Sequence, residues 1–225
     1  MYKNEHILKL MTYNIHSGKD LWMRPSFNSI IQYMENTQAN VMCIQEINEN
    51  EKRGYQVSKI NNTLQTHCSF APNVPLGRGY YGTATFTSFS ILENHHFLLS
   101  SKKEQRGLLH TVLSLGIQRL HVLNTHLGLA KVERNQQFQF IREYISQLHP
   151  PVILMGDFNT TTLELQDIPL IDAAQISRQE HIPTFIPMRK RIDYIFVSPS
   201  IKVLNYHVAP SCFSDHYPVL IQVSI

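Results

Sequence analysis

Short runs of apolar residues recur along the chain, and many of them end in a polar or acidic residue. Because these runs are short and rich in Val and Ile, they predict buried β-strands rather than helices. The clearest of them cover residues 8–14, 41–46, 120–126, 152–157 and 192–197. Further strands are predicted at residues 83–86, 91–100, 108–115, 203–207 and 219–223.

Helical spacing appears in three places. After Pro25 and Ser26, the apolar side chains of Ile30, Ile31 and Met34 fall on one face of a short helix. Between residues 132 and 148, the apolar positions 138, 141, 145 and 148 predict an amphipathic helix that ends before Pro150 and Pro151. A third helix is predicted over residues 57–64. Many strands with few helices predict an α+β fold, in which two packed sheets carry helices on their outer faces.

Composition narrows the class of protein. A chain of 225 residues can bury about 70% of its surface, and the absence of an internal linker predicts a single domain over residues 1–225. The net charge of +3 and the 16% of charged residues exclude a disordered chain and argue against a dedicated polybasic binder. Apolar stretches are too short to span a membrane.

The amino terminus and the cysteines suggest a compartment. Lys9 interrupts the short apolar run that follows the first residues, so the amino terminus lacks the core of a signal peptide. Three cysteines without CxxC spacing fit buried thiols in a reducing cytosol better than disulfides or a zinc knuckle. We therefore expect a cytoplasmic protein without a stable membrane anchor, and a monomer.

Polar residues cluster at the ends of the predicted strands. Alternation along an extended chain places Asp157 and Asn159 on one side, while Phe158 turns toward the core. Taken singly, each of these motifs also fits an ordinary turn, a solvated strand end or a core histidine. Together they give four carboxylates, two amides and two imidazoles: Glu46, Asp157, Asp193, Asp215, Asn14, Asn159, His126 and His216.

This set of side chains favours one kind of chemistry. Oxygen-rich ligands without cysteine suit a hard cation, Mg²⁺ or Mn²⁺, rather than zinc. Imidazoles and amides beside such a cation suit a substrate that develops negative charge, such as a phosphoester.

Six motifs in order resemble the endonuclease/exonuclease/phosphatase superfamily, from about residue 8 to the carboxyl terminus. They are TYNIH (12–16), IQE (44–46), NTHLG (124–128), GDFN (156–159), DYIFVS (193–198) and SDHYPV (214–219). The stretch Glu104-Gln105-Arg106-Gly107 is similar to one in compact bacterial members. The resemblance implies a four-layer αββα sandwich and a hydrolase that uses Mg²⁺ or Mn²⁺ on a phosphodiester or phosphomonoester.

The resemblance also implies roles for individual residues. Glu46 would be the principal metal ligand, with Asn14 beside it and Asp215 as a further carboxylate on the metal side. Asp157 would orient or deprotonate the attacking water. His216, whose tautomer Asp193 would fix, would contact the scissile phosphate, and Asn159 would help to hold it. His126 would contact the phosphate or the leaving group, and Tyr81 would touch the phosphate. Arg106 would either contact the phosphate or form a structural ion pair.

The substrate stays open at this level. Lys102-Lys103 and residues 189–191 could line a groove for nucleic acid, which would make the protein a DNA nuclease. Residues 185–188 are the only candidate apolar loop for a lipid head group, and a small-molecule phosphoester is equally compatible. A protein that binds a phosphorylated ligand without catalysis also fits the sequence, as does a zinc hydrolase, which the twelve histidines suggest.

Overall fold

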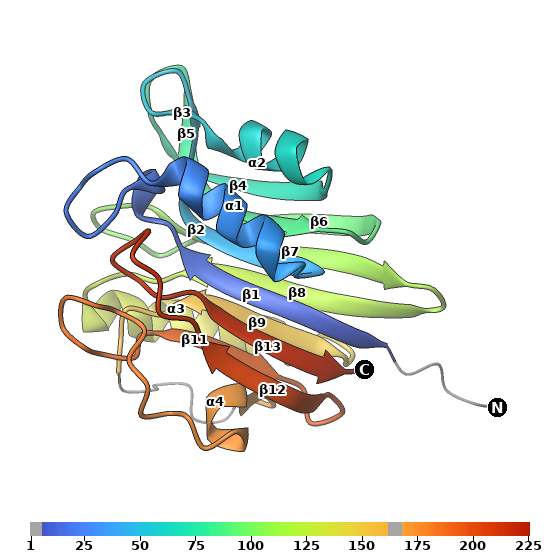
Figure 1. The fold of residues 1–225 in the computed structure, drawn as a ribbon. Helices are drawn as coiled ribbons and strands as arrows, with labels where there is room; N and C mark the ends of the chain where they lie inside the picture. Colours follow the sequence, from blue (N-terminus) through green and yellow to red (C-terminus); the bar gives the residue numbers. More distant parts are fainter. Residues whose placement is uncertain (1–5, 162–167) are drawn as a thin grey trace.

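The computed structural model describes residues 6–161 and 168–225, and Figure 1 shows their arrangement. The prediction that the amino terminus lacks a signal peptide concerns in part residues 1–5, which lie outside the described residues. Within the described part, one sheet has seven strands. In spatial order these are β12 (Lys202–Val208), β13 (Val219–Ser224), β1 (Ile7–Asn14), β2 (Val41–Asn50), β5 (Gly79–Thr87) and β4 (His67–Pro75), with β3 (Gly54–Tyr55) paired to β2.

A second sheet in the described residues has six strands. Their spatial order is β10 (Ile171–Asp172), β11 (Asp193–Val197), β9 (Val152–Asp157), β8 (Gln118–His126), β7 (Arg106–Leu115) and β6 (Ile91–Leu99). Both sheets are mixed, because β1 and β2 run parallel in the first and β8 and β9 run parallel in the second.

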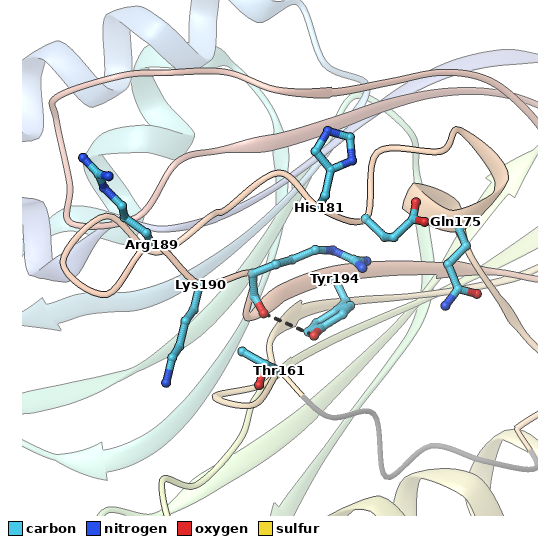
Figure 2. A pocket seen from close by; sticks show the side chains of 8 residues that line it. Thr161, Gln175, His181, Arg189, Lys190 and Tyr194 are labelled. Atoms are coloured by element: carbon cyan, nitrogen blue, oxygen red, sulfur yellow. Dashed lines mark hydrogen bonds between the residues drawn. The ribbon is translucent and has the colours of Figure 1, made fainter.

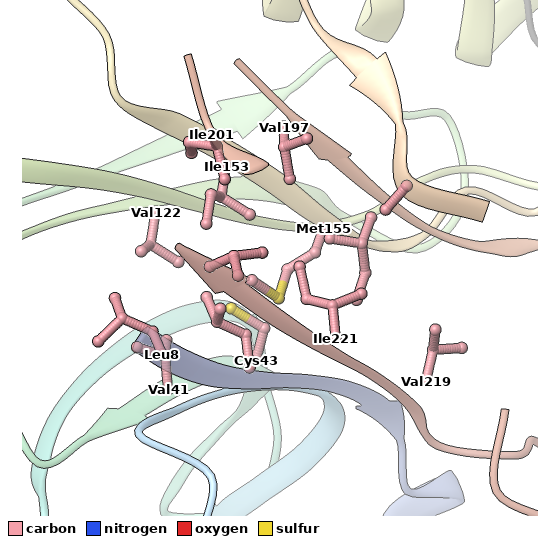
Figure 3. Packing of buried hydrophobic residues seen from close by; sticks show 14 of the residues in the cluster. Leu8, Val41, Cys43, Val122, Ile153, Met155, Val197, Ile201, Val219 and Ile221 are labelled. Carbon is pink, nitrogen blue, oxygen red and sulfur yellow. The ribbon is translucent and has the colours of Figure 1, made fainter. Parts of the chain in front are cut away.

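Alternation of side chains along the strands produces three apolar layers. Leu10 and Ile153 enter a central core between the two sheets, which Figure 3 shows from close by. Met11, one residue after Leu10, faces the other way, against α1 (Phe27–Thr37) and α2 (Gln56–Leu64). Leu154 likewise packs outward against α3 (Lys131–Ile145). The predicted α+β fold, a four-layer αββα sandwich, is therefore confirmed.

Most predicted elements are present with small shifts of their ends. The helix predicted over 132–148 is α3 and ends at Ile145, and the strand predicted over 41–46 continues to Asn50. Three strands, β3, β4 and β10, and the short helix α4 (Ala173–Ile176) were not predicted. No helix in the described ranges has the length and apolar character needed to cross a membrane.

The topology brings the polar strand ends together. Parallel pairing sets Asn14, the last residue of β1, beside Gln45 within β2, and it sets His126 beside Asp157 at the carboxyl ends of β8 and β9. Antiparallel pairing sets Asp193 opposite Asp157. In Figure 1 this end of the sandwich lies at the left, where the loops after β1, before β11 and before β13 gather, away from the carboxyl terminus.

Candidate active site

Asp157 lies at the centre of the polar cluster and is 1% exposed. It is the last residue of β9, and its Oδ1 accepts a hydrogen bond from the backbone N–H of Asn159 at 2.9 Å. Its Oδ2 faces three side chains: Asn14 Nδ2 at 3.0 Å, His126 Nε2 at 3.5 Å and His216 Nε2 at 3.7 Å. Burial raises the pKa of this carboxyl to about 7, against the lowering effect of His216.

Asn14 joins the two sheets at this end of the sandwich. Its Nδ2 donates both to Asp157 in the second sheet and to Glu46 Oε1, at 3.1 Å, in the first. Its Oδ1 accepts the backbone N–H of His16 at 3.0 Å, which fixes the amide orientation. Ser214 Oγ donates to the Asn14 carbonyl at 2.8 Å. One amide therefore holds two carboxylates at a fixed separation.

Glu46 occupies an unusual backbone position. Its φ is +56°, in the left-handed region, and the pairing of β2 with β5 shifts register between Ile44 and Ile47. Such a bulge turns one side chain away from the regular alternation. Asn159, with φ of +50°, is a second left-handed residue in the cluster. Strained non-glycine residues concentrate at functional sites, where the surroundings hold them.

Asp193 and His216 form a buried pair. His216 Nδ1 lies 2.9 Å from Asp193 Oδ2, and the two residues are 4% and 1% exposed. Burial acts to lower the pKa of His216, but the carboxylates of Asp193 and Asp157 outweigh it and raise the pKa to about 10. The imidazole is therefore charged at neutral pH, with Nε2–H directed toward Asp157. The Phe185 ring covers it, with ring centroids 4.8 Å apart.

His126 is uncharged at neutral pH, unlike His216. Burial and the positive charges of Arg106 and His216 hold its pKa well below the usual range. Arg106 Nη1 lies 2.9 Å from His126 Nδ1 and also pairs with Glu104. The same Nη1 lies 3.2 Å from His126 Nε2, which in turn lies 3.5 Å from Asp157 Oδ2, so the neutral ring sits between the guanidinium and the central carboxylate. Glu104, Arg106 and His126 thus form a chain that leads to the central carboxylate.

The remaining predicted residues lie around this core. Asp215 Oδ1 is 3.6 Å from His16 Nδ1, and Asp215 is partly exposed. Tyr81 lines a cleft of about 370 Å³ together with Glu46 and Glu104, and burial and the Glu46 carboxylate raise its pKa well above the usual value. Tyr81 therefore stays protonated and can donate.

Asn159 is near the cluster, but its amide nitrogen is already used. Asn159 Nδ2 donates to the Leu127 carbonyl at 2.9 Å, and its backbone N–H holds Asp157. The visible contribution of Asn159 is therefore to orient the carboxylate, and the predicted phosphate contact stays a prediction.

Several neighbours of the cluster were not among the predicted site residues. Phe185, which covers His216, comes from the loop before β11, and its position depends on tertiary structure alone. His16 alternates with Asn14 along the chain, and that spacing was the available signal. Glu104 lies two residues before Arg106, in the stretch that resembles bacterial relatives. Gln45, next to Glu46, is not at the site: its Nε2 donates to Asn124 Oδ1 at 2.8 Å between the sheets.

A larger cavity of about 590 Å³ is lined in part by residues 189–191, which follow Phe185 in the loop before β11. Figure 2 shows its lining, which includes Arg189, Lys190 and His181 and, from β11, Tyr194. Arg191 is held in a buried ion pair, since its Nη2 lies 2.6 Å from both oxygens of Asp172. Of residues 189–191, Arg189 and Lys190 therefore take no part in the ion pair with Asp172.

The donor set suits a hard divalent cation. The carboxylate oxygens of Glu46 and Asp157 converge on the amide nitrogen of Asn14, and no cysteine lies among these residues. Asp193 Oδ1 is buried without a hydrogen-bond partner in the described part of the chain. Among the described residues, Asp157, Asp193 and His216 form a group of three potential metal ligands. Their ligand atoms lie within 4.8 Å of one another. This group differs from the predicted ligands Glu46, Asn14 and Asp215.

Comparison with known proteins identifies the class. Residues 11–216 match the model of the Endonuclease/Exonuclease/phosphatase family. The chain belongs to this family, whose members are hydrolases that act on phosphoesters, generally with a divalent metal.

Individual proteins are similar to this chain in sequence or in fold. The chain is 25% identical over 171 residues to the uncharacterized protein YbhP of Escherichia coli (strain K12), covering 67% of this chain and 66% of the length of that protein. A family protein from Bacteroides thetaiotaomicron has a similar fold, with a TM-score of 0.80, 19% identity and coverage of 99% and 96% of the two chains. D. rerio TDP2, solved with a single-strand DNA product, gives a TM-score of 0.78, 18% identity and coverage of 96% and 98%.

Proposed function

We propose that this protein is a divalent-metal-dependent phosphoesterase that hydrolyses a phosphodiester or phosphomonoester by in-line attack of an activated water. The observation that carries the proposal is the arrangement around Asp157. One buried carboxylate faces a charged imidazole, a neutral imidazole and an amide that also holds Glu46.

The raised pKa of Asp157 suits a general base. A base is most effective when its pKa lies near the working pH, and burial brings this carboxyl to about 7. Asp157 would orient the water and accept its proton as the water attacks phosphorus. The backbone N–H of Asn159 fixes Oδ1, so Oδ2 is the oxygen that would receive the proton.

The two histidines would act on the phosphate in different ways. His216 carries a positive charge and is held by Asp193, so it would donate to a non-bridging oxygen as negative charge develops. His126 is neutral and lies between Arg106 and Asp157. With its proton on Nε2, the nitrogen that faces Asp157, it would donate to the phosphate or the leaving oxygen. Tyr81 is a further donor on the cleft wall.

The metal would be held on the Glu46 side of the cluster. A charged His216 repels a cation, which disfavours the group of Asp157, Asp193 and His216 as its ligands. Glu46 and Asp215 would supply carboxylate oxygens. Asn14 would supply an oxygen with its amide turned, because in the present orientation its Nδ2 bonds Glu46 and its Oδ1 accepts the His16 N–H. A bound Mg²⁺ or Mn²⁺ would neutralise phosphate oxygens and so lower the barrier to attack by a nucleophile.

Calorimetry with Mg²⁺ tests the metal assignment. Glu46→Gln removes one negative charge without changing shape, so Mg²⁺ affinity should fall about tenfold or more. Glu35→Gln, on the exposed side of α1, is the matched control and should bind Mg²⁺ as the wild type does. Unchanged affinity in Glu46→Gln would remove Glu46 from the metal site.

A substrate screen tests the activity itself. Metal-stripped and Mg²⁺-loaded protein should be compared on bis(p-nitrophenyl) phosphate, plasmid, abasic DNA, sphingomyelin and inositol phosphates. Hydrolysis of at least one ester that depends on Mg²⁺ is expected. Binding of phosphorylated ligands without turnover of any ester would favour a non-catalytic protein, and activation by Zn²⁺ alone would favour a zinc hydrolase.

A further inference from the structure

A second cavity adjoins the cleft that contains Glu46. It measures about 320 Å³, and Ser17, Lys19 and Arg53 line both spaces. The two cavities therefore lie on either side of one wall, which the loop after β1 and the turn before β3 provide. We call the second cavity the outer subsite.

The outer subsite is positively charged. Lys19, Arg53 and Lys59 line it, and its lining contains no Asp or Glu, whereas the cleft sets two of these cations against Glu46 and Glu104. Among the described residues, neither Lys19 nor Arg53 lies within ion-pair distance of a carboxylate. Lys59 Nζ donates to the neutral Asn28 Oδ1 at 2.8 Å. Three cations without carboxylates in one small cavity favour an anionic ligand.

Aromatic rings accompany these cations. Tyr55 lines the outer subsite and is 55% exposed, and Lys59 Nζ lies 5.6 Å from the centroid of the Phe27 ring. Trp22, on the same loop as Lys19, is 73% exposed, and its backbone N–H is held by Asp20 Oδ1 at 2.9 Å. Exposed rings beside cations are the surface on which unstacked bases and their phosphates bind.

The floor of the outer subsite is fixed by the fold. Gly18 has φ of +78°, and a Cβ there would lie 2.7 Å from Gln56 Nε2 and 2.9 Å from Phe27 Cβ. Gln56 Nε2 donates to the Ser17 carbonyl at 2.8 Å, and its Oε1 accepts the backbone N–H of Asn48 at 2.9 Å. Because these bonds are internal to the protein, the cavity is formed before any ligand binds, which reduces the cost of binding.

We propose that the outer subsite binds the nucleotide next to the scissile phosphoester of a single-stranded nucleic acid. The phosphate of that nucleotide contacts Arg53 and Lys59, and its base stacks on Tyr55. In a duplex the base faces are covered by their neighbours, so a stacking surface of this kind selects unpaired strands. This inference rests on the proposed phosphoesterase function, because the scissile group must lie in the adjoining cleft.

Binding can be measured separately from hydrolysis. Fluorescence anisotropy of a labelled eight-nucleotide single strand in EDTA reports affinity without cleavage. The double variant Arg53→Gln/Lys59→Gln should weaken binding about tenfold or more at low salt. The slope of log affinity against log salt should become shallower by about 0.7, since one neutralised phosphate is lost. Tyr55→Leu should weaken binding about fivefold or more. Lys202→Gln, an exposed cation on β12, is the control and should bind normally.

Three results would overturn the outer subsite. The first is an unchanged affinity and salt slope in the double variant. The second is equal affinity for a duplex of the same sequence. The third is an inositol polyphosphate that binds as tightly as the strand and whose binding Tyr55→Leu does not change. Wild-type hydrolysis of bis(p-nitrophenyl) phosphate with Mg²⁺ reports the proposed function alone. If that activity is present while the variants bind the strand normally, the outer subsite fails and the phosphoesterase stands. If activity on every ester is absent while the variants lose binding, the phosphoesterase fails and the protein retains a strand-binding site.

Discussion

At the residue scale, Asp157 must meet two opposing demands, because a general base has to be ionised to accept a proton and burial disfavours the ionised form. The charge on His216 lowers the pKa of Asp157, and hydrogen bonds from Asn14 and the Asn159 backbone act in the same direction. These contacts offset part of the cost of burial, so the carboxyl titrates near neutrality. The neutral His126 on its other side adds no further positive charge.

Asp193 should act through His216 rather than on the substrate. Asp193→Asn keeps the shape of the side chain but removes the charge that holds the imidazolium, so kcat should fall about 100-fold while KM changes little. Steady-state kinetics on bis(p-nitrophenyl) phosphate measures both values. A KM that rises with kcat unchanged would show instead that Asp193 serves substrate binding.

The sequence identified most of these residues because strand alternation is local. Asn14 and Asp157 end strands whose apolar pattern is plain, and the structure joins them by one hydrogen bond. The left-handed backbone of Glu46 was not predictable, since nothing in a glutamate indicates a positive φ. The hydrogen bond from Asn159 to Leu127 was also not predictable from the sequence, because it depends on where the loop after β8 lies.

At the element scale, the absence of β4 from the predicted strands has a physical explanation. β4 contains Pro72 and Pro75, which lack the N–H of a central strand, and its apolar side chains do not form a continuous run. It is the last strand in the spatial order of its sheet, where unpaired positions are tolerated. The continuation of β2 to Asn50 was missed for a related reason, because the bulge at Glu46 interrupts the alternation.

Packing of β7, β8 and α3 places a histidine cluster far from the strand ends. His110 is 2% exposed, and its two ring nitrogens lie 2.7 Å from the Tyr144 hydroxyl and 2.9 Å from His121 Nδ1. Burial, with smaller effects from His121 and His95, lowers the pKa of His110 to about 4. The unfolded chain therefore takes up this proton more readily than the folded protein does.

That difference predicts acid sensitivity. The pKa of His110 is lower in the folded protein than in the unfolded chain. Its titration therefore does not change the unfolding free energy above about pH 6.5, and it lowers that free energy progressively as the pH falls toward 4. The unfolding free energy of both proteins should fall when the pH is lowered from 7.5 to 4.5. In His110→Gln this fall should be about 1–3 kcal/mol smaller than in the wild type. Urea unfolding at the two pH values measures this, with the exposed His67→Gln as control. Equal losses in wild type and His110→Gln would exclude His110 as the sensor.

At the scale of the whole molecule, the site exists because two sheets meet with a fixed offset. The sequence indicated two sheets and their outer helices, and the family resemblance implied a common site for the polar strand ends, but the apolar pattern alone does not specify how the two sheets align. Gln45 contributes to that alignment, since its Nε2 bonds Asn124 in the second sheet and Thr12 in the first. Glu46, the next residue, is thereby placed against Asn14.

Gln45→Ala should weaken this contact between the sheets. The change leaves buried polar atoms of Asn124 and Thr12 without partners, which costs about 1–3 kcal/mol and corresponds to a fall in Tm of about 2–10 °C for a chain of this size. Calorimetric melting of Gln45→Ala and of the exposed helix control Gln32→Ala measures the difference. Identical Tm values for the two variants would show that Gln45 does not stabilise the sandwich.

The central claim is that the buried cluster around Asp157 is a hydrolytic centre, and the most direct test is the turnover of Asp157→Asn on bis(p-nitrophenyl) phosphate with saturating Mg²⁺. We expect kcat to fall about 1000-fold, because the amide cannot accept the proton of the attacking water. The unfolding free energy should stay the same or rise, because a buried ionisable group is replaced by a neutral one of the same shape. A stable Asp157→Asn variant that keeps kcat within tenfold of the wild type would show that the cluster around Asp157 is not the hydrolytic centre.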